Sequence, residues 1–307
     1  MRNYYDIIPK DGYYLIQEKY TENSGLTIGL VSGQEKAMLF DSGMGVFGTE
    51  LREIVERLTD LPVVCVVSHG HPDHIGGAVL FDEVYMNSRD EGQLGRLAPE
   101  GRLRDVGMFS RKDQEVMDYA AAHVLDCSGF TYRNIDGGDE VDLGGVTFEI
   151  LCLRGHSKGS IAAFNRKDGY CFSGDAFSPH LPASSVRNPQ EFQDMADDME
   201  AFLAAVPPET TIYSGHMLEP VKRSRIEELK TAAAELAAGK TAGDKDIFMP
   251  ISPVKNQKEH VCGSISITYD PLIYYKSPVL SGRVNGRTRA HRHTDTRDAN
   301  PYKQEAR

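Results

Sequence analysis

One heptapeptide of this chain gathers an unusual density of groups that bind metal ions. The segment SHGHPDH, residues 68–74, holds three histidines and an aspartate, in a chain with ten histidines among 307 residues. Neutral imidazole and carboxylate oxygen are both zinc ligands, and a catalytic zinc site keeps one position open for water. His69 and His71 are two residues apart in a tight turn and can reach one ion, whereas Asp73 and His74 face elsewhere and suit a second ion.

Two ions need more ligands than one heptapeptide provides, and four other polar residues follow predicted strands. The apolar runs AMLF, FEILCLRG, YCFSG and TIYSG lead into Asp41, His156, Asp175 and His216. Short apolar runs bounded by Gly or Ser are typical of buried strands. Polar groups at the ends of such strands converge on one rim of a sheet core. We therefore expect His156, Asp175 and His216 to complete the metal site.

Helical patterns lie between the predicted strands and indicate a layered α/β domain with helices outside the sheet core. The segment TELREIVERL places its apolar side chains on one face. A second helix is expected to begin with Asn188 as N-cap and Pro189 as its first residue. A third is expected to end at Gly239. A further helix is expected to begin at Ile75, close to the metal site.

Two irregular segments are expected to border the site. Residues 86–131 form a polar, partly helical insertion, and residues 176–189 form a loop rich in Pro and Ser. Loops of this length beside a site often form its rim. His180 lies in the second segment and is either a substrate contact or an exposed loop residue. Lys158 and Ser160 either cap a helix or contact substrate.

The expected domain covers residues 1–280, with its core at about 20–240. Residues 281–307 carry seven Lys or Arg against three Asp or Glu, without apolar periodicity. This composition predicts a disordered basic tail.

The strand-end residues and the heptapeptide together resemble a known family. SHGHPDHIGG is similar to the HxHxDH signature of the metallo-β-lactamase-fold hydrolases, whose αββα sandwich holds one or two metals between its sheets. LFDSG, RGHSKGS, FSGDAF and YSGH resemble the family's other motifs in their usual order. The resemblance covers roughly residues 20–240 and implies an α/β fold, a four-layer αββα sandwich.

The resemblance implies that seven side chains hold two ions, with three ligands on each and one ligand shared. The first ion's ligands would be His69, His71 and His156; the second ion's would be Asp73, His74 and His216; the shared ligand would be Asp175. Asp41 would be hydrogen-bonded to a ligand histidine and fix its orientation. Asp73 would also be catalytic, because it would orient the attacking group.

Departures from other members of the family narrow the expected function. The common class B β-lactamases have cysteine where this chain has Asp175, and flavodiiron proteins have glutamate at the position of His71. Imidazole in place of carboxylate favours two Zn²⁺, with Mn²⁺ or Fe²⁺ as alternatives. About 40 residues separate Asp175 from His216, too few for the large domain that RNA-processing members insert there. The bridging aspartate resembles the glyoxalase II-like and lactonase-like branches.

These features predict a dinuclear metal-dependent hydrolase that uses a metal-bridging hydroxide on a small ester, thioester or lactone. One alternative is a small-molecule phosphodiesterase of the same fold. An alternative of another class is a non-catalytic or redox metal protein. A structural zinc site is closed by four ligands, often cysteines, and none of the seven ligands here is a cysteine. Hydrolysis is therefore favoured, and the substrate's identity stays open.

The average charge bears on partners and location. The net charge is −11, and the residues before 281 include 27 basic and 42 acidic side chains. This balance disfavours nucleic acid and acidic membranes as partners, so we expect a small-molecule substrate. No apolar stretch approaches the roughly 18 residues of a membrane span, and the N-terminus lacks the apolar region of a secretory signal. With five scattered cysteines suited to reduced thiols, these features predict a cytoplasmic protein. Whether it forms a homo-oligomer stays open.

Overall fold

The computed structural model describes residues 2–22, 24–248 and 256–274, and the strands in this part of the chain form three sheets. In spatial order, the first sheet comprises β1 (Tyr5–Pro9), β2 (Tyr13–Thr21), β3 (Ser24–Ser32), β4 (Ala37–Phe40), β5 (Val63–Val66), β6 (Glu83–Met86) and β7 (Arg133–Asn134). The second comprises β13 (Thr211–Tyr213), β11 (Tyr170–Phe172), β10 (Ile161–Asn165), β9 (Thr147–Cys152) and β8 (Glu140–Asp142). The third comprises β12 (His180–Pro182), β16 (Ile265–Tyr269), β15 (Gln257–Cys262) and β14 (Lys245–Ile247).

The first two sheets share a buried core because alternate residues of their strands point toward each other. Met38 and Phe40 of β4 belong to the same apolar cluster as Phe148 and Ile150 of β9. Leu39, between the two β4 residues, belongs to a different cluster, which forms on the outer face of the first sheet. The space between the sheets is therefore filled with side chains.

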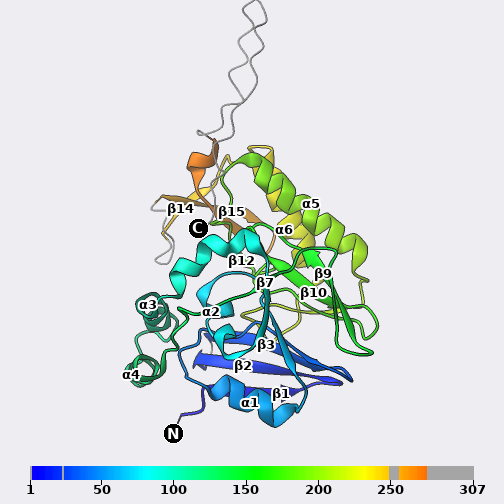
Figure 1. The fold of residues 1–307 in the computed structure, drawn as a ribbon. Coiled ribbons are helices and arrows are strands. Elements are labelled where there is room, and N and C mark those ends of the chain that lie inside the picture. The colour runs from blue at the N-terminus through cyan, green and yellow to red at the C-terminus, as the bar shows by residue number, and fades with distance from the viewer. Residues whose placement is uncertain (1, 23, 249–255, 275–307) are drawn as a thin grey trace, which may run out of the picture. The chain divides into compact units, whose positions relative to one another are not determined.

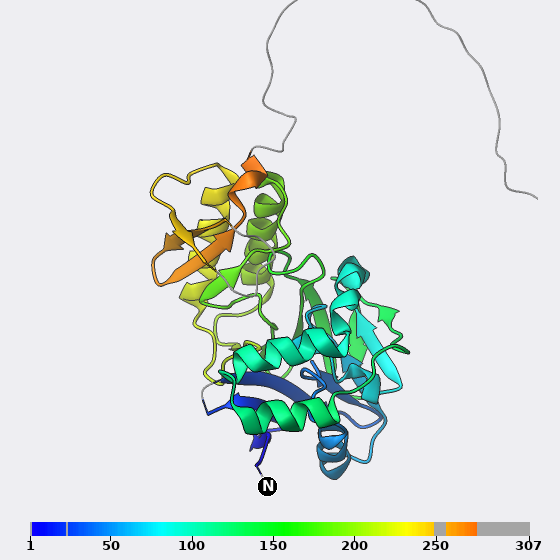
Figure 2. The same ribbon diagram turned by 90° about the vertical axis from the view of Figure 1, so that its left-hand side faces the viewer.

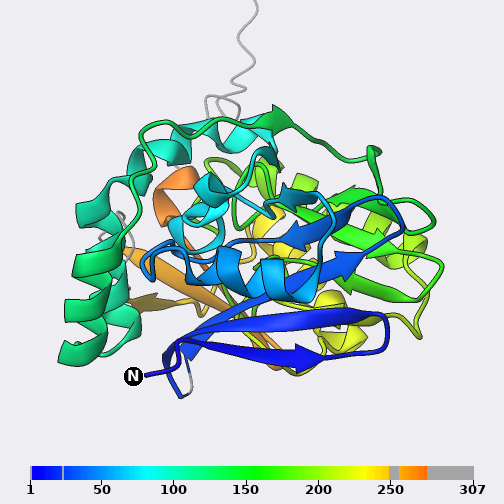
Figure 3. The ribbon, with the colours of Figure 1, turned by 60° about the horizontal axis from the view of Figure 1, so that its bottom comes forward.

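Helices cover the outer faces of both sheets. The helices are α1 (Glu50–Leu58), α2 (Pro72–Ile75), α3 (Pro99–Phe109), α4 (Gln114–His123), α5 (Pro189–Ala205) and α6 (Arg223–Ala237), with 3₁₀ helices η1 (Ala78–Leu80), η2 (Ser88–Leu97) and η3 (Pro271–Tyr274). Helix α1 packs on the first sheet (Figure 3), and α5 and α6 pack on the second (Figure 1). This order of layers confirms the predicted αββα sandwich.

Helix ends follow the local chemistry of the chain. Helix α5 begins as predicted, with the Asn188 side chain accepting a hydrogen bond from the Glu191 N–H and with Pro189 at the first position. Gly239 follows α6 with a φ of +71°, a conformation that favours glycine. The helix expected to begin at Ile75 instead ends there, because Pro72 already has the φ of a first helical residue.

The third sheet was not predicted. Residues 176–189, expected to be a loop throughout, contain strand β12, which pairs in parallel with β16. Residues 86–131 contain η2, α3 and α4, which fits the partly helical insertion; Figure 2 places α3 and α4 side by side. The segment 281–307 lies outside the described residues, and the 1–280 domain stays a prediction. Within the described ranges, no helix combines the length and the hydropathy needed to cross a bilayer.

A buried arginine anchors the insertion to the first sheet. Arg102 on α3 is fully buried. Its guanidinium donates hydrogen bonds to the carbonyls of Leu97 at 2.9 Å, Met44 at 3.1 Å and Gly45 at 3.0 Å, and also to the carbonyl of Leu125. Two of these carbonyls belong to the loop after β4 and two to the insertion. A charge so far from water is tolerated because its donors are used.

The substitution Arg102→Ala is expected to lower the free energy of unfolding by more than about 2 kcal/mol, because buried carbonyls lose their donor. Denaturant titration measures this loss. Arg104→Ala on the same helix is the control; that side chain is 76% exposed, and its removal is expected to cost no more than about 0.5 kcal/mol. Equal losses in the two variants would show that the Arg102 bonds do not anchor the insertion.

Candidate metal centre

The structure brings all seven predicted metal ligands to one rim of the sandwich. Strands β4 and β5 run parallel in the first sheet, and β11 and β13 run parallel in the second. Strand β9 has the same direction as β11, because both are antiparallel to β10. The carboxyl ends of these parallel strands therefore lie at one edge of each sheet, where the loops that follow them carry the histidines and aspartates.

Three imidazoles form the first group. The Nε2 atom of His69 lies 2.9 Å from Nδ1 of His71, and the same His71 atom lies 2.9 Å from Nε2 of His156. Burial lowers the pKa of each of these three histidines, and the neighbouring imidazoles lower the pKa of His69 and His71 further. The three rings are therefore neutral at physiological pH, the form in which imidazole binds a metal.

Hydrogen bonds on the far side of two rings determine which nitrogen carries the proton. Nδ1 of His156 donates to the carbonyl of Pro182 at 3.0 Å. Nδ1 of His69 lies 3.0 Å from Oγ of Ser68, whose own hydrogen goes to Oδ2 of Asp41. Both Nε2 atoms therefore point lone pairs at the centre of the group. This pattern is typical of histidines that ligate a metal.

The second group consists of Asp73, His74 and His216. Nε2 of His216 lies 3.2 Å from Oδ2 of Asp73, and Nε2 of His74 lies 3.7 Å from the same oxygen. Nδ1 of His216 donates to the carbonyl of Gly25 at 2.8 Å. The ligand atoms of the three residues lie within 4.8 Å of one another, close enough for one ion.

Asp175 lies between the two groups. Its carboxylate oxygens are 3.5 Å from Nε2 of His156 in the first group. They are 3.4 Å from Nε2 of His74 and 3.3 Å from Nε2 of His216 in the second. A carboxylate has two oxygens and can serve both groups at once. Asp175 thus stands where a ligand shared by two ions would stand.

Asp41 lies behind His74 and orients it. Its carboxylate accepts hydrogen bonds from the Ser68 N–H at 2.7 Å and from Nδ1 of His74 at 2.8 Å. The Asp41 backbone has a φ of 67°, a strained region for any residue other than glycine, although aspartate is among the residues that tolerate it. These bonds compensate for that strain and leave Nε2 of His74 facing Asp73 and Asp175.

Electrostatics make the second group strongly attractive to a cation. Burial alone would lower the pKa of His74, but the carboxylates of Asp41, Asp175 and Asp73 outweigh it and raise that pKa to about 10. Burial alone would raise the pKa of both Asp73 and Asp175, but the nearby His74 and His216 outweigh it and hold both pKa values below the usual range. Both carboxylates are therefore ionised at neutral pH.

Two atoms of the cluster fit a metal ion better than they fit the protein alone. Nε2 of His74 and Oδ1 of Asp175 are buried and lack a hydrogen-bond partner, although such atoms are nearly always paired. They face each other across 3.4 Å. A donor set of imidazole nitrogen and carboxylate oxygen, without thiolate, suits Zn²⁺ and also accommodates Mn²⁺ or Fe²⁺. The residues present therefore fit a transition metal.

The three expected substrate contacts lie in different environments. His180 is exposed on β12, with Nδ1 3.0 Å from Oγ of Ser266. Lys158 is about half exposed and lies 3.8 Å from a carboxylate oxygen of Glu191. Ser160 is buried, and its hydroxyl lies 2.7 Å from that of Ser157. Ser160 therefore packs beneath the site instead of lining its rim.

Sequence reasoning missed several groups that surround the centre. Phe109, at the end of α3, stacks on His216 with ring centroids 6.2 Å apart. The buried carboxylate of Asp90, in η2, bonds to both loops that carry the first group. Neither has a local sequence signal, because each acts on a residue at least 20 positions away.

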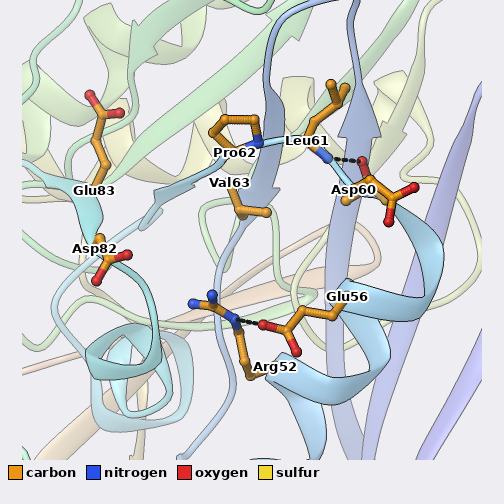
Figure 4. Close-up of a pocket in the computed structure, with 9 residues that line it drawn as sticks. Arg52, Glu56, Asp60, Leu61, Pro62, Val63, Asp82 and Glu83 are labelled. Atoms are coloured by element: carbon orange, nitrogen blue, oxygen red, sulfur yellow. Dashed lines mark hydrogen bonds and ion pairs between the residues drawn. The ribbon is translucent and has the colours of Figure 1, made fainter.

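A cavity of about 530 Å³ lies at the opposite end of the first sheet (Figure 4). It is bordered by Val63 at the start of β5 and Glu83 at the start of β6. Its Arg52 is paired with Glu56 at 2.6 Å. It contains none of the seven candidate ligands, and we assign the chemistry to the rim that holds them.

Known proteins are similar to the part of the chain that contains the candidate metal centre. Residues 25–216 match the sequence profile of the Metallo-beta-lactamase superfamily. The acyl-coenzyme A thioesterase MBLAC2 of Homo sapiens is 28% identical over 187 residues, which are 54% of this chain and 63% of the relative. A hydroxyacylglutathione hydrolase of Xanthomonas campestris is 28% identical over 188 residues, 61% of this chain and 58% of the relative. The chain thus spans about three fifths of the length of these relatives.

A solved structure shares the fold. A beta-lactamase domain protein from Burkholderia ambifaria superposes with a TM-score of 0.54 at 21% identity, over 79% of this chain and 77% of the other.

The purified protein, supplied with zinc, is expected to carry about two transition-metal equivalents, because seven ligands exceed the needs of one tetrahedral ion. Asp175→Asn is expected to weaken binding at the second group most and to lose about one equivalent on dialysis. Elemental analysis measures both. His123→Ala, which removes an exposed histidine of α4, is the control and is expected to keep two. Wild-type protein without metal, or full activity after exhaustive chelation, would contradict the assignment.

Proposed function

The chain belongs to the Metallo-beta-lactamase superfamily, and on that premise we propose that it is a dinuclear metal-dependent hydrolase of small thioesters. The observation that carries the proposal is the convergence of two largely buried ligand groups on one carboxylate. Asp175 lies within 3.5 Å of histidines from both groups. Such a geometry supports a pair of ions held side by side at the end of a β-sandwich, which is the requirement for shared activation of one water.

The first ion would be held by the three imidazoles whose pKa values burial lowers, and the second by the acidic group. The proposed ligands are His69, His71 and His156 for the first, Asp73, His74 and His216 for the second, and Asp175 for both. When bound, zinc lowers the pKa of a coordinated water to about 7 and withdraws charge from a substrate carbonyl. Every other contribution comes from the chain's own residues.

Asp73 is the proposed catalytic carboxylate. It is ionised, and its side chain is 12% exposed, so it can reach both water and the buried ligands. Nε2 of His216 lies 3.2 Å from one of its oxygens, so the two side chains face the same position for an ion. In this position Asp73 orients the attacking water, accepts its proton and returns a proton to the leaving thiolate.

The exposed side of the centre favours a substrate with an apolar acyl part. His216 is the most exposed of the second group's ligands, at 31% of its side chain. The ring of Phe109 stacks on it, so the entrance has an aromatic wall. A thioester can be neutral at its reacting carbon and needs no basic cleft, which agrees with the acidic composition of the chain.

The relatives support a thioester over a lactone or another ester. Both are named for thioester hydrolysis, of acyl-coenzyme A in one case and of hydroxyacylglutathione in the other. Their acyl carriers differ, and the matched region covers about three fifths of each. The shared feature is therefore the thioester bond, and experiment must identify the thiol that carries the acyl group.

Asp73→Asn is expected to lower kcat by about two orders of magnitude or more, because the variant can no longer accept a proton. Steady-state kinetics on a thioester, at equal metal content, measures the change. His180→Ala provides the contrast: it removes an exposed histidine outside the two groups and is expected to alter KM at most. Turnover near the wild-type value in Asp73→Asn would remove Asp73 from the mechanism.

A panel of chromogenic thioester, lactone and phosphodiester substrates tests the substrate class. At one metal loading, kcat/KM is expected to be highest for a small thioester. RNA and DNA are expected to remain uncut, because the net charge repels polyanions over a Debye length of about 8 Å. A clear preference for phosphodiesters would move the assignment to a phosphodiesterase with the same ligands. Metal-loaded protein inactive on all three would favour a non-catalytic role.

A further inference from the structure

We propose that Asp90, in the insertion, is a positioning residue that holds the two loops of the first ligand group at a constant separation. The inference rests on the proposed metal centre. His69 and His71 belong to the loop after β5, and His156 belongs to the loop after β9, in the other sheet. Among the described residues no strand pairing joins these two sheets, although a backbone bond from the Ile161 N–H to the Ser68 carbonyl, at 2.9 Å, connects the ends of the two loops. Asp90 adds a side-chain support to the 2.9 Å approach of His71 to His156.

The carboxylate of Asp90 bonds both loops at once. Oδ2 accepts a hydrogen bond from the Gly70 N–H at 2.9 Å, between the two histidines of the first loop. The same oxygen accepts one from the Ser157 hydroxyl at 2.6 Å, and Oδ1 accepts one from the Gly159 N–H at 2.8 Å. Asp90 is only 2% exposed, so water does not compete for these donors. Each bonded loop residue lies within three positions of a proposed ligand.

Both loops approach Asp90 so closely that they need glycine there. A Cβ atom at Gly70 would lie 2.9 Å from Cβ of Asp90, and one at Gly159 would lie 2.9 Å from its Cγ. Non-bonded carbon atoms do not tolerate such distances. The two backbones therefore pack directly against the Asp90 side chain.

Asp90 is itself held in place from the first sheet. The side chain of Asn87 caps η2 by accepting a hydrogen bond from the Arg89 N–H at 3.0 Å. The Ser88 N–H donates to Oδ1 of Asn134 in β7 at 2.8 Å. The turn that carries Asp90 thus has a defined position relative to β6 and β7. If this turn were flexible, Asp90 could not keep the two loops at a constant distance from each other.

Ser160 extends the same network. Its hydroxyl lies 2.7 Å from that of Ser157, which donates to Asp90. It also accepts a hydrogen bond from the Ser157 N–H at 3.2 Å. Ser160, a candidate substrate contact by sequence, thereby supports the His156 loop from inside.

Removing the carboxylate leaves two buried amides and one hydroxyl without their acceptor. The loops would keep the backbone bond between Ile161 and Ser68, but the position of His156 against His71 would be less constrained. Outer hydrogen bonds of this kind typically contribute 10- to 100-fold in metal affinity. The loss should fall on the first group, because Asp73, His74 and His216 make no hydrogen bond with Asp90 among the described contacts.

Asp90→Ala in the full chain is the primary test, with Asp244→Ala as its matched control. Asp244 is also a buried carboxylate with two strong partners, His260 at 2.8 Å and Tyr269 at 2.7 Å. It directly precedes β14, the edge strand of the third sheet farthest from β12, and no described hydrogen bond or ion pair joins it to a proposed ligand. Zinc affinities come from competition with a chelator. Hydrogen–deuterium exchange of the metal-free proteins follows peptides covering residues 68–74 and 154–161.

Asp90→Ala is expected to weaken one of the two zinc ions about 10- to 100-fold and to accelerate exchange in both loops. Asp244→Ala is expected to lower the melting temperature without changing either readout. Should Asp90→Ala fail to fold, Ser157→Ala tests the same idea: it removes one of three bonds and is expected to weaken that ion a few-fold. Asp90→Asn keeps one acceptor oxygen and is expected to fall between wild type and Asp90→Ala.

Unchanged affinity and exchange in the Asp90 and Ser157 variants would overturn the inference. Equal effects of Asp90→Ala and Asp244→Ala would also overturn it, because the loss would then be general instability. A wild-type protein that binds no metal would instead refute the proposed function. Exchange in the metal-free proteins would even then report whether Asp90 holds the loops.

Discussion

The constraint on which the rest of the structure depends is the direction of the imidazole lone pairs. A ligand histidine must present a bare nitrogen to the centre, so its other nitrogen must donate a hydrogen bond elsewhere. Four of the five histidines here meet this requirement through a defined partner. The pairs are His69 with Ser68, His74 with Asp41, His156 with Pro182 and His216 with Gly25. The surrounding fold provides these partners at the correct distance.

These partners come from parts of the chain that are far apart in sequence. Gly25 belongs to β3, Asp41 to the loop after β4, and Pro182 to β12 in the third sheet. Pro182 is placed by the pairing of β12 with β16, in which it lies opposite Thr268. Strand β16 follows the region 25–216 that matches the superfamily. The strands beyond the common fold therefore contribute to the orientation of a ligand that the common fold supplies.

The sequence predicted the elements that end in a ligand, and for a physical reason. A buried strand appears as a short apolar run, and a polar residue at its end lies at the rim whatever the rest of the fold does. The candidate ligands His156, Asp175 and His216 could be placed this way, and so could Asp41, which orients His74. The third sheet could not, because its strand β12 has only three residues, one of them exposed, and pairs with β16 about 85 residues further along the chain. Asp90 could not either, because its partners are mostly backbone amides, which leave no pattern in a sequence.

Ser160 and Ile75 illustrate a second limit. A serine shortly after a ligand histidine reads equally well as a substrate contact or as an internal support, and only its burial decides between them. The short helix beside the centre begins at Pro72, inside the ligand motif, and not after it. The fixed φ of Pro72 starts the helix inside the motif, before the two glycines that follow Ile75. Local sequence thus predicts the candidate ligands more reliably than it predicts the turns that carry them.

The insertion is part of the wall of the centre, and this bears on how substrate enters. Three of its contacts lie at or near the centre: Asp90 bonds both loops of the first group, Arg102 bonds the loop after β4, and Phe109 stacks on His216. Hinged opening of the whole insertion would break the buried bonds of Asp90 and Arg102, each worth about 1–3 kcal/mol when its partner is left unsatisfied. The summed cost of breaking these bonds approaches the free energy of unfolding of a whole domain. We therefore expect substrate to enter beside His216. Its side chain is already partly exposed, and the aromatic ring of Phe109 lies next to it.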